Sequence, residues 1–199
     1  MRKLKLQVFM SVDGFIAGLG GEDLDDSPTP EQPPTSETDE KMEQYIHSTI
    51  DTSDTILLGR KMTNEFITYW ENVVNNQPES PEFPLAKKLV DTPKIVFSKT
   101  LKESSWNNTT LATGDLVDEI NQLKNKKGKD IIVYGGGGFV SSLIKEGLID
   151  EFHLFINPNA LGQGMPIFHR LTKPQNLKLK NATAFSNGVA LLVYELKRD

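Results

Sequence analysis

Four consecutive glycines, Gly135 to Gly138, are the most distinctive chemical feature of this sequence. They follow the apolar run 132–134 and precede Phe139 and Val140, the pattern of a strand that passes into a helix. The first N–H groups of a helix have no partner within it, and without side chains in the way a phosphate can approach them closely. The run therefore predicts a phosphate contact, whereas a merely flexible connection would need only one or two glycines. It is not a dinucleotide fingerprint, because residue 140 is Val, nor a P-loop, because no Lys-Ser/Thr pair follows.

Two further segments place cations directly after apolar runs. Gly59-Arg60-Lys61 opens a helical pattern, so two positive charges oppose the dipole of that helix unless an anion binds there. Arg suits bidentate contact with phosphate, and Lys neutralises it as a point charge. Ser98-Lys99-Thr100 ends another strand-like run and adds hydroxyls. Each segment alone could be a solvated surface, but open α/β sheets bind ligands where strands end, so the set predicts one anionic ligand.

The elements that would position these segments alternate between strand and helix. Apolar runs predict strands over 4–12, 55–58, 94–98 and 130–134. Apolar spacings of three and four predict helices that begin after 36–39, at 60, near 85, at 115 and near 139. The helix that begins at 60 is expected to end near 70. Such alternation up to about residue 150 predicts an α/β domain, a three-layer α/β/α sandwich with much parallel pairing.

The C-terminal part follows a different pattern. A strand is expected over 152–156, and the runs 177–185 and 189–196 flank Ser186-Asn187-Gly188, a strong hairpin signal. The central sheet should therefore be mixed, mostly parallel, and should end in an antiparallel hairpin. With no internal repeat, residues 1–199 are expected to form a single domain.

Composition excludes several classes of partner. The net charge of −5 gives no electrostatic support for binding nucleic acid or an anionic membrane. No apolar run approaches the roughly 20 residues of a membrane span, and the absence of cysteine fits a reducing, cytoplasmic location. The three histidines are scattered, so no metal site is expected. Residues 19–40 contain eight acids and four prolines, which predicts a long mobile loop.

Several short motifs, taken in order, resemble those of the dihydrofolate reductase-like superfamily. The sequence is most similar there to the C-terminal reductase domain of the riboflavin-biosynthesis deaminase–reductase. The resemblance spans almost the whole chain and rests on the segments 11–17, 56–61, 96–101, 133–137, 147–152 and 158–168.

This resemblance implies NADPH as the cofactor and a homodimer. Residues Gly59, Arg60 and Lys61, with Ser98, Lys99 and Thr100, would hold the adenosine 2′-phosphate and neighbouring phosphates. The segment Gly135, Gly136, Gly137, Gly138, Phe139 and Val140 would lie along the pyrophosphate and nicotinamide, with a cis Gly135–Gly136 bond. Ile16 and Ala17 would face the nicotinamide ring. The family often has Thr where this chain has Met62, which removes one expected phosphate contact.

The predicted activity is an NADPH-dependent reduction of a small heterocyclic or ribosylamino-pyrimidine substrate, such as 5-amino-6-(5-phosphoribosylamino)uracil. The alternatives are a dihydrofolate or pterin reductase and a nucleotide-binding module without turnover. Asp13 is either a turn residue, the interpretation favoured by the following Gly14, or a polar group of the active site. Asp25 is the other candidate catalytic acid, but Asp23, Asp26, Glu37 and Asp39 offer equivalent carboxyl groups, and solvent could also supply the proton.

Overall fold

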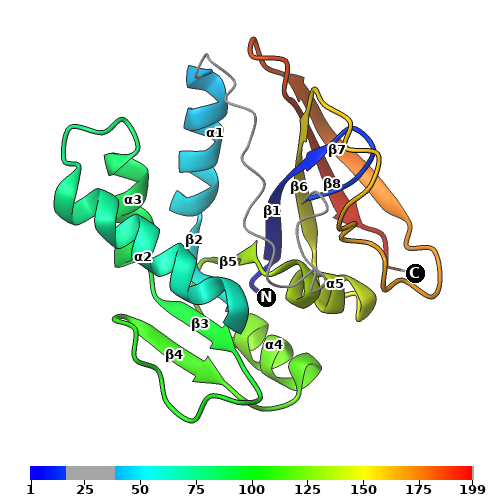
Figure 1. Ribbon diagram of the computed structural model, residues 1–199. Helices are drawn as coiled ribbons and strands as arrows, with labels where there is room; N and C mark the ends of the chain where they lie inside the picture. The colour runs from blue at the N-terminus through cyan, green and yellow to red at the C-terminus, as the bar shows by residue number, and fades with distance from the viewer. Residues whose placement is uncertain (17–38, 199) are drawn as a thin grey trace.

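A single eight-stranded sheet organises the protein, as the computed structural model in Figure 1 shows. The structure describes residues 1–16 and 39–198, so most of the predicted 19–40 loop lies outside the described residues. The strands are β1 (Leu4–Ser11), β2 (Ser53–Gly59), β3 (Lys94–Phe97), β4 (Thr109–Ala112), β5 (Asp130–Gly135), β6 (Glu151–Asn157), β7 (Leu177–Ala184) and β8 (Ala190–Leu196). The helices are α1 (Glu40–Asp51), α2 (Arg60–Asn76), α3 (Phe83–Asp91), α4 (Leu116–Asn125) and α5 (Gly137–Lys145).

The strand order is β4-β3-β2-β5-β1-β6-β8-β7. The first six strands in this order pair in parallel, whereas β8 pairs antiparallel with both β6 and β7. This arrangement confirms the predicted mixed sheet that ends in an antiparallel hairpin. Because β2, β3 and β5 are parallel neighbours, their carboxyl ends lie side by side at one edge of the sheet.

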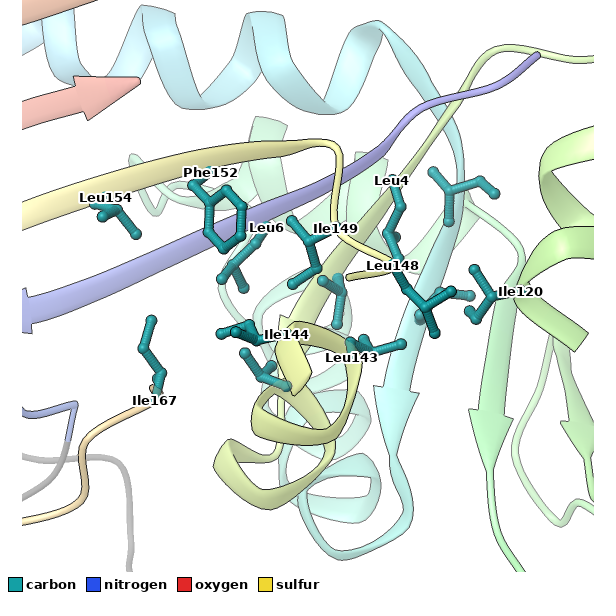
Figure 2. Close-up of a cluster of buried hydrophobic side chains, with 14 of the residues drawn as sticks. Leu4, Leu6, Ile120, Leu143, Ile144, Leu148, Ile149, Phe152, Leu154 and Ile167 are labelled. Carbon is teal, nitrogen blue, oxygen red and sulfur yellow. The ribbon is translucent and has the colours of Figure 1, made fainter. Parts of the chain in front are cut away.

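Helices cover both faces of the sheet, which confirms the predicted three layers. On one face, α4 and α5 contribute Ile120 and Leu143 to a buried cluster with strand residues such as Leu6. Figure 2 shows how these side chains converge between the sheet and the helices. On the other face, α1, α2 and α3 pack Ile50, Phe66 and Leu89 against the sheet. Successive side chains of β2 point to opposite faces of the sheet, so this strand contributes to both clusters. Leu57 belongs to the first cluster, and Ile56 and Leu58 belong to the second.

Two elements differ from the sequence-based expectation. Strand β4 was not expected, because its four residues include two threonines and it lies at the sheet edge with little apolar content. Helix α2 runs to Asn76 instead of ending near 70, since buried Val73 continues its apolar face. No described helix is both long and apolar enough to span a lipid bilayer. That residues 1–199 form one domain stays a prediction.

Candidate functional site

The three segments predicted to bind one anion come together at the carboxyl edge of the sheet. Gly59, the last residue of β2, lies in register with Phe97, the last residue of β3. On its other side, Leu58 lies opposite Gly135 of β5. Residues 60–61, 98–100 and 136–138 continue from these three strand ends. They meet because parallel strands direct their carboxyl ends to the same edge, however far apart they are in sequence.

Glycine at 59 allows the starts of α2 and α5 to touch. A Cβ atom added at Gly59 would lie 2.8 Å from the Cβ of Phe139 and 3.3 Å from the carbonyl oxygen of Gly135. Gly136 has a φ of +75°, a conformation that favours glycine. The predicted cis bond between Gly135 and Gly136 is wrong, because every described peptide bond is trans. The positive φ at Gly136 turns the chain from strand to helix without that bond.

Both helices that begin at this edge lack a side-chain cap. Helices α1 and α4 begin after Asp39 and Asp115, whose carboxylates accept backbone N–H groups of the first turn. Helices α2 and α5 instead begin after Gly59 and Gly136, and neither has an acidic residue in its first turn. The positive ends of two helix dipoles therefore lie together. The exposed Arg60, in the first turn of α2, adds a full positive charge. This arrangement favours an anion.

The 98–100 segment is divided between structural and exposed groups. The Ser98 side chain is buried, and its Oγ accepts hydrogen bonds from the N–H groups of Thr100 at 3.2 Å and Leu101 at 3.0 Å. Lys99 and Thr100 are exposed. The Ser98 hydroxyl therefore closes the turn, and Lys99 and Thr100 are the groups of this segment that a ligand can reach.

Aromatic packing connects the same segment to the glycine run. The ring of Phe97 stacks on that of Phe139 with 4.9 Å between centroids and 29° between planes. Val140 points into the core and is only 3% exposed. The structure therefore does not support the predicted cofactor contact from the Val140 side chain. The main chain of 136–139 borders the carboxyl edge of the sheet.

Ile16, which the resemblance places against the nicotinamide ring, lies beside the glycine run. Its Cδ1 would be 2.9 Å from a Cβ added at Gly137, and its N–H donates to the carbonyl of Met165 at 2.9 Å. Ala17 lies outside the described residues, so its predicted contact with the nicotinamide ring is not described.

Two methionines at this edge were not anticipated as contacts of the glycine run. The Sδ of Met62 accepts a hydrogen bond from the N–H of Gly136 at 3.2 Å. The Sδ of Met165 would be 2.5 Å from a Cβ added at Gly137. The sequence marked Met62 only as a departure from the family pattern, and it contained no signal for Met165, because that contact depends on how the 158–168 loop folds back.

Asp13 holds the 158–168 loop against the end of β1. Its carboxylate accepts hydrogen bonds from Ser11 Oγ at 2.5 Å, from Gly162 N at 2.7 Å and from Leu161 N at 3.1 Å. These donors, Ser11 first, lower the pKa of Asp13 to about 2. A carboxylate ionised at neutral pH has no proton to give, so the structure supports the turn and loop-anchoring role rather than that of a catalytic acid.

The other described candidate acid, Asp39, is also engaged. Asp39 caps α1, and its carboxylate accepts from both the side chain and the N–H of Ser186, which lower its pKa to about 2. Asp25, like Asp23, Asp26 and Glu37, lies outside the described residues. Among the residues that the structure describes, no group of three or more His, Asp or Glu side chains is placed to hold a metal ion.

The mixed sheet, the helix layers and the glycine-lined carboxyl edge together define an α/β protein of the dihydrofolate reductase-like fold. The family model described as the RibD C-terminal domain matches residues 2–191. The chain therefore belongs to the RibD C-terminal domain family, as its motifs predicted.

Relatives in Bacillus subtilis match nearly the full length. The chain is 35% identical to the uncharacterized protein YyaP, over 97% of this chain and 94% of that protein. It is 31% identical to the uncharacterized protein YwjB, over 96% of each. These two proteins support the family without assigning an activity.

Solved structures share the fold at low identity. A Shewanella protein described as a candidate riboflavin biosynthesis protein matches with a TM-score of 0.68 and 24% identity over 100% of both chains. The Thermotoga maritima diaminohydroxyphosphoribosylaminopyrimidine deaminase/5-amino-6-(5-phosphoribosylamino)uracil reductase matches with a TM-score of 0.65 and 16% identity. That match covers 98% of this chain but 57% of the Thermotoga chain.

Proposed function

We propose that this protein is an NADPH-dependent reductase of a small heterocycle or a ribosylamino-pyrimidine. The observation that carries the proposal is the meeting of two helices without side-chain caps, α2 and α5, at the edge where β2, β3 and β5 end. Membership of the RibD C-terminal domain family also supports a reductase. A substrate related to 5-amino-6-(5-phosphoribosylamino)uracil is proposed by analogy with the Thermotoga protein of that name.

The residues at this edge fit a dinucleotide. The close contact between Gly59 and the start of α5 leaves the main chain of both helix starts facing the same side, where a pyrophosphate can meet their N–H groups. Arg60 and Lys61, from the first turn of α2, and Lys99, from the turn after β3, would neutralise phosphate charge. The 2′-phosphate that distinguishes NADPH from NADH is assigned to these cations.

Ile16 and the glycine run would hold the nicotinamide end. Ile16 lies beside Gly137, and the buried Met165 closes the apolar wall behind them. When bound, NADPH supplies a hydride to a C=N or C=O bond of the substrate. The part of the protein described here orients the cofactor and excludes water from one side of it.

The proton that completes the reduction is proposed to come from solvent or from a carboxyl group outside the described residues, such as that of Asp25, because neither described candidate acid has a proton to give. Asp13 and Asp39 are both ionised and are bound to backbone N–H groups, Asp13 in the 158–168 loop and Asp39 at α1 and the hairpin turn. Their pKa values of about 2 leave a negligible protonated fraction at neutral pH. If Asp13 is not the proton donor, an Asp13 variant that folds should reduce the substrate as fast as wild type.

Calorimetric titration with NADPH and NADH tests the cofactor assignment. In the Arg60→Ala variant, loss of a charge-assisted hydrogen bond should weaken NADPH binding by about 10- to 100-fold and leave NADH binding nearly unchanged. Lys126→Ala is a matched control, because Lys126 is an exposed cation at the end of α4, away from the carboxyl edge. Equal loss in both variants, or an unchanged preference for NADPH in Arg60→Ala, would refute the 2′-phosphate site.

Turnover is a separate measurement. The protein is incubated with NADPH and either an aminouracil ribosyl phosphate or dihydrofolate, and nicotinamide absorbance is followed at neutral pH. Oxidation with the ribosylated substrate supports the proposal, and oxidation only with dihydrofolate makes the protein a folate reductase. Binding of NADPH without oxidation across a broad panel of heterocycles would make it a nucleotide-binding module.

A homodimer, a cytoplasmic location and the lack of nucleic acid or membrane partners stay predictions. Light scattering of the purified protein would determine its oligomeric state, and cell fractionation would determine its location.

A further inference from the structure

Met62 occupies the place where the glycine run would receive a phosphate. It lies in the first turn of α2 and is half-buried. Its Sδ accepts the Gly136 N–H at 3.2 Å, and a Cβ added at Gly135 would be 2.1 Å from Sδ and 2.9 Å from Cε. The thioether therefore lies directly on the main chain of the 135–136 segment, which the absence of a Cβ makes possible.

This contact is weaker than the one an anion would make. A thioether sulfur is a weak hydrogen-bond acceptor, whereas a phosphate oxygen accepts a charge-assisted bond about twice as strong as a neutral one. The N–H of Gly136 also lies at the positive end of the α5 dipole, where a negative charge gains further stabilisation. Sulfur and phosphate oxygen cannot both occupy the same position on this N–H. A bound phosphate would therefore displace the Met62 thioether.

The position of Met62 allows that movement. Met side chains have three rotatable bonds and adapt to different shapes, and Met62 is only half-buried where it packs against the cluster that contains Phe66. Met165, the other methionine on the glycine run, is only 5% exposed, and its backbone is held by the N–H of Ile16. Met165 is thus a fixed wall, whereas Met62 is the side chain that can leave.

We propose that Met62 is a built-in competitor of the cofactor pyrophosphate, and that its thioether lowers the affinity of this site. The inference rests on the proposed function, since it takes the pyrophosphate of a dinucleotide as the ligand of the 135–138 segment. The inference predicts the sign of the change in affinity. Removal of the Met62 side chain should tighten cofactor binding, whereas removal of an ordinary ligand contact weakens it.

The experiment compares Met62→Ala with wild type by calorimetric titration, using NADPH and inorganic pyrophosphate as separate probes. We expect about five-fold tighter binding of both probes in Met62→Ala, which corresponds to about 1 kcal/mol at 1.4 kcal/mol per ten-fold. Met42→Ala is the matched control, since Met42 is also half-buried, lies on α1 and accepts a hydrogen bond from Asn187 Nδ2 at 3.9 Å. Met42→Ala should leave both affinities unchanged.

A second measurement uses wild-type protein, so it does not depend on whether Met62→Ala folds. In wild-type protein with 13C-labelled methionine methyl groups, saturating pyrophosphate should shift the Met62 signal and leave the Met42 signal in place. Pyrophosphate affinity that is unchanged or weaker in Met62→Ala, or a Met62 signal that does not move, overturns the inference.

The outcomes separate this inference from the proposed function. If wild type binds NADPH but Met62→Ala binds it no better, the competitor role is wrong and the cofactor assignment stands. If neither protein binds NADPH but pyrophosphate binds more tightly to Met62→Ala, the cofactor assignment is wrong and the competitor role at an anion site stands.

Discussion

The contact between the starts of α2 and α5 can be tested by adding one methyl group at Gly59. Gly59 has a φ of −78° and a ψ of 143°, which alanine adopts without strain, so Gly59→Ala introduces no backbone strain. The new Cβ would lie 2.8 Å from Phe139 Cβ and 3.3 Å from the Gly135 carbonyl oxygen. Neither atom is the far end of a flexible side chain. The stacking of Phe139 on Phe97 further prevents the Phe139 ring from turning away.

The helix starts must therefore separate by about 0.6 Å to restore ordinary contact. Overpacking of this kind costs about 1–3 kcal/mol, and alanine is a poorer residue than glycine before the first turn of a helix by about 0.5 kcal/mol. The total of roughly 1.5–3.5 kcal/mol corresponds to a fall in Tm of roughly 3–14 °C for a chain of this size. Because the two sets of N–H groups move apart, NADPH affinity should also fall by at least about ten-fold, a loss of about 1.4 kcal/mol.

Thermal unfolding by circular dichroism and calorimetric titration with NADPH measure the two effects. Gly114→Ala is a matched control, because the added Cβ there would meet only the Glu119 carboxylate, at 2.7 Å, and that flexible group can move. Its Tm should stay within about 2 °C of wild type, as expected for an exposed site. If Gly59→Ala has the same Tm as Gly114→Ala and binds NADPH as tightly as wild type, the two helix starts do not form a rigid anion site.

Two predictions concern the supports of the fold. Asp13→Asn should lower the Tm at pH 7, because the carboxylate holds Gly162 N and Leu161 N. Since folding lowers the pKa of Asp13 to about 2, its contribution is complete above the unfolded value near 3.9 and is lost as the pH falls through 2. The Tm difference from wild type should therefore shrink below pH 4, and a constant difference from pH 7 to pH 2.5 would contradict the assignment. Lys124→Met should reduce the free energy of unfolding, measured by urea denaturation, by about 1 kcal/mol. The buried Lys124 Nζ lies 2.6 Å from Asp150 Oδ2, but Arg198 and the N–H of Leu4 still contact that carboxylate after the substitution. If Lys124→Met is as stable as wild type, the buried ion pair makes no net contribution.

Local patterns were sufficient for most of the fold. Apolar runs and alternating apolar residues predicted seven of the eight strands, because burial on one or both faces of a sheet leaves a periodic signal in the chain. The Asn187-Gly188 pair predicted the antiparallel ending for a similarly local reason, since Gly188, with a φ of +87°, adopts the left-handed conformation that closes the hairpin. Strand β4 escaped because its stability comes from pairing with β3 rather than from its own side chains.

The candidate site was predictable in outline but not in atomic detail. Gly59 and Gly135 end two neighbouring strands, and Ser98 follows a third. This arrangement was predictable from their place at the ends of apolar runs, since parallel strands share a carboxyl edge. The tertiary structure alone decided which groups are exposed at this edge. It turned the Ser98 hydroxyl into its own loop and Val140 into the core.

Sequence by itself thus determined the order of elements, the mixed sheet and the glycine-lined edge, because these depend on periodicity and on backbone freedom. Only the tertiary structure placed Met62 on the N–H of Gly136 and committed Asp13 and Asp39 to backbone donors. Those contacts join residues 74, 149 and 147 positions apart, respectively. Their geometry depends on how separate elements pack, which no local pattern of residues records.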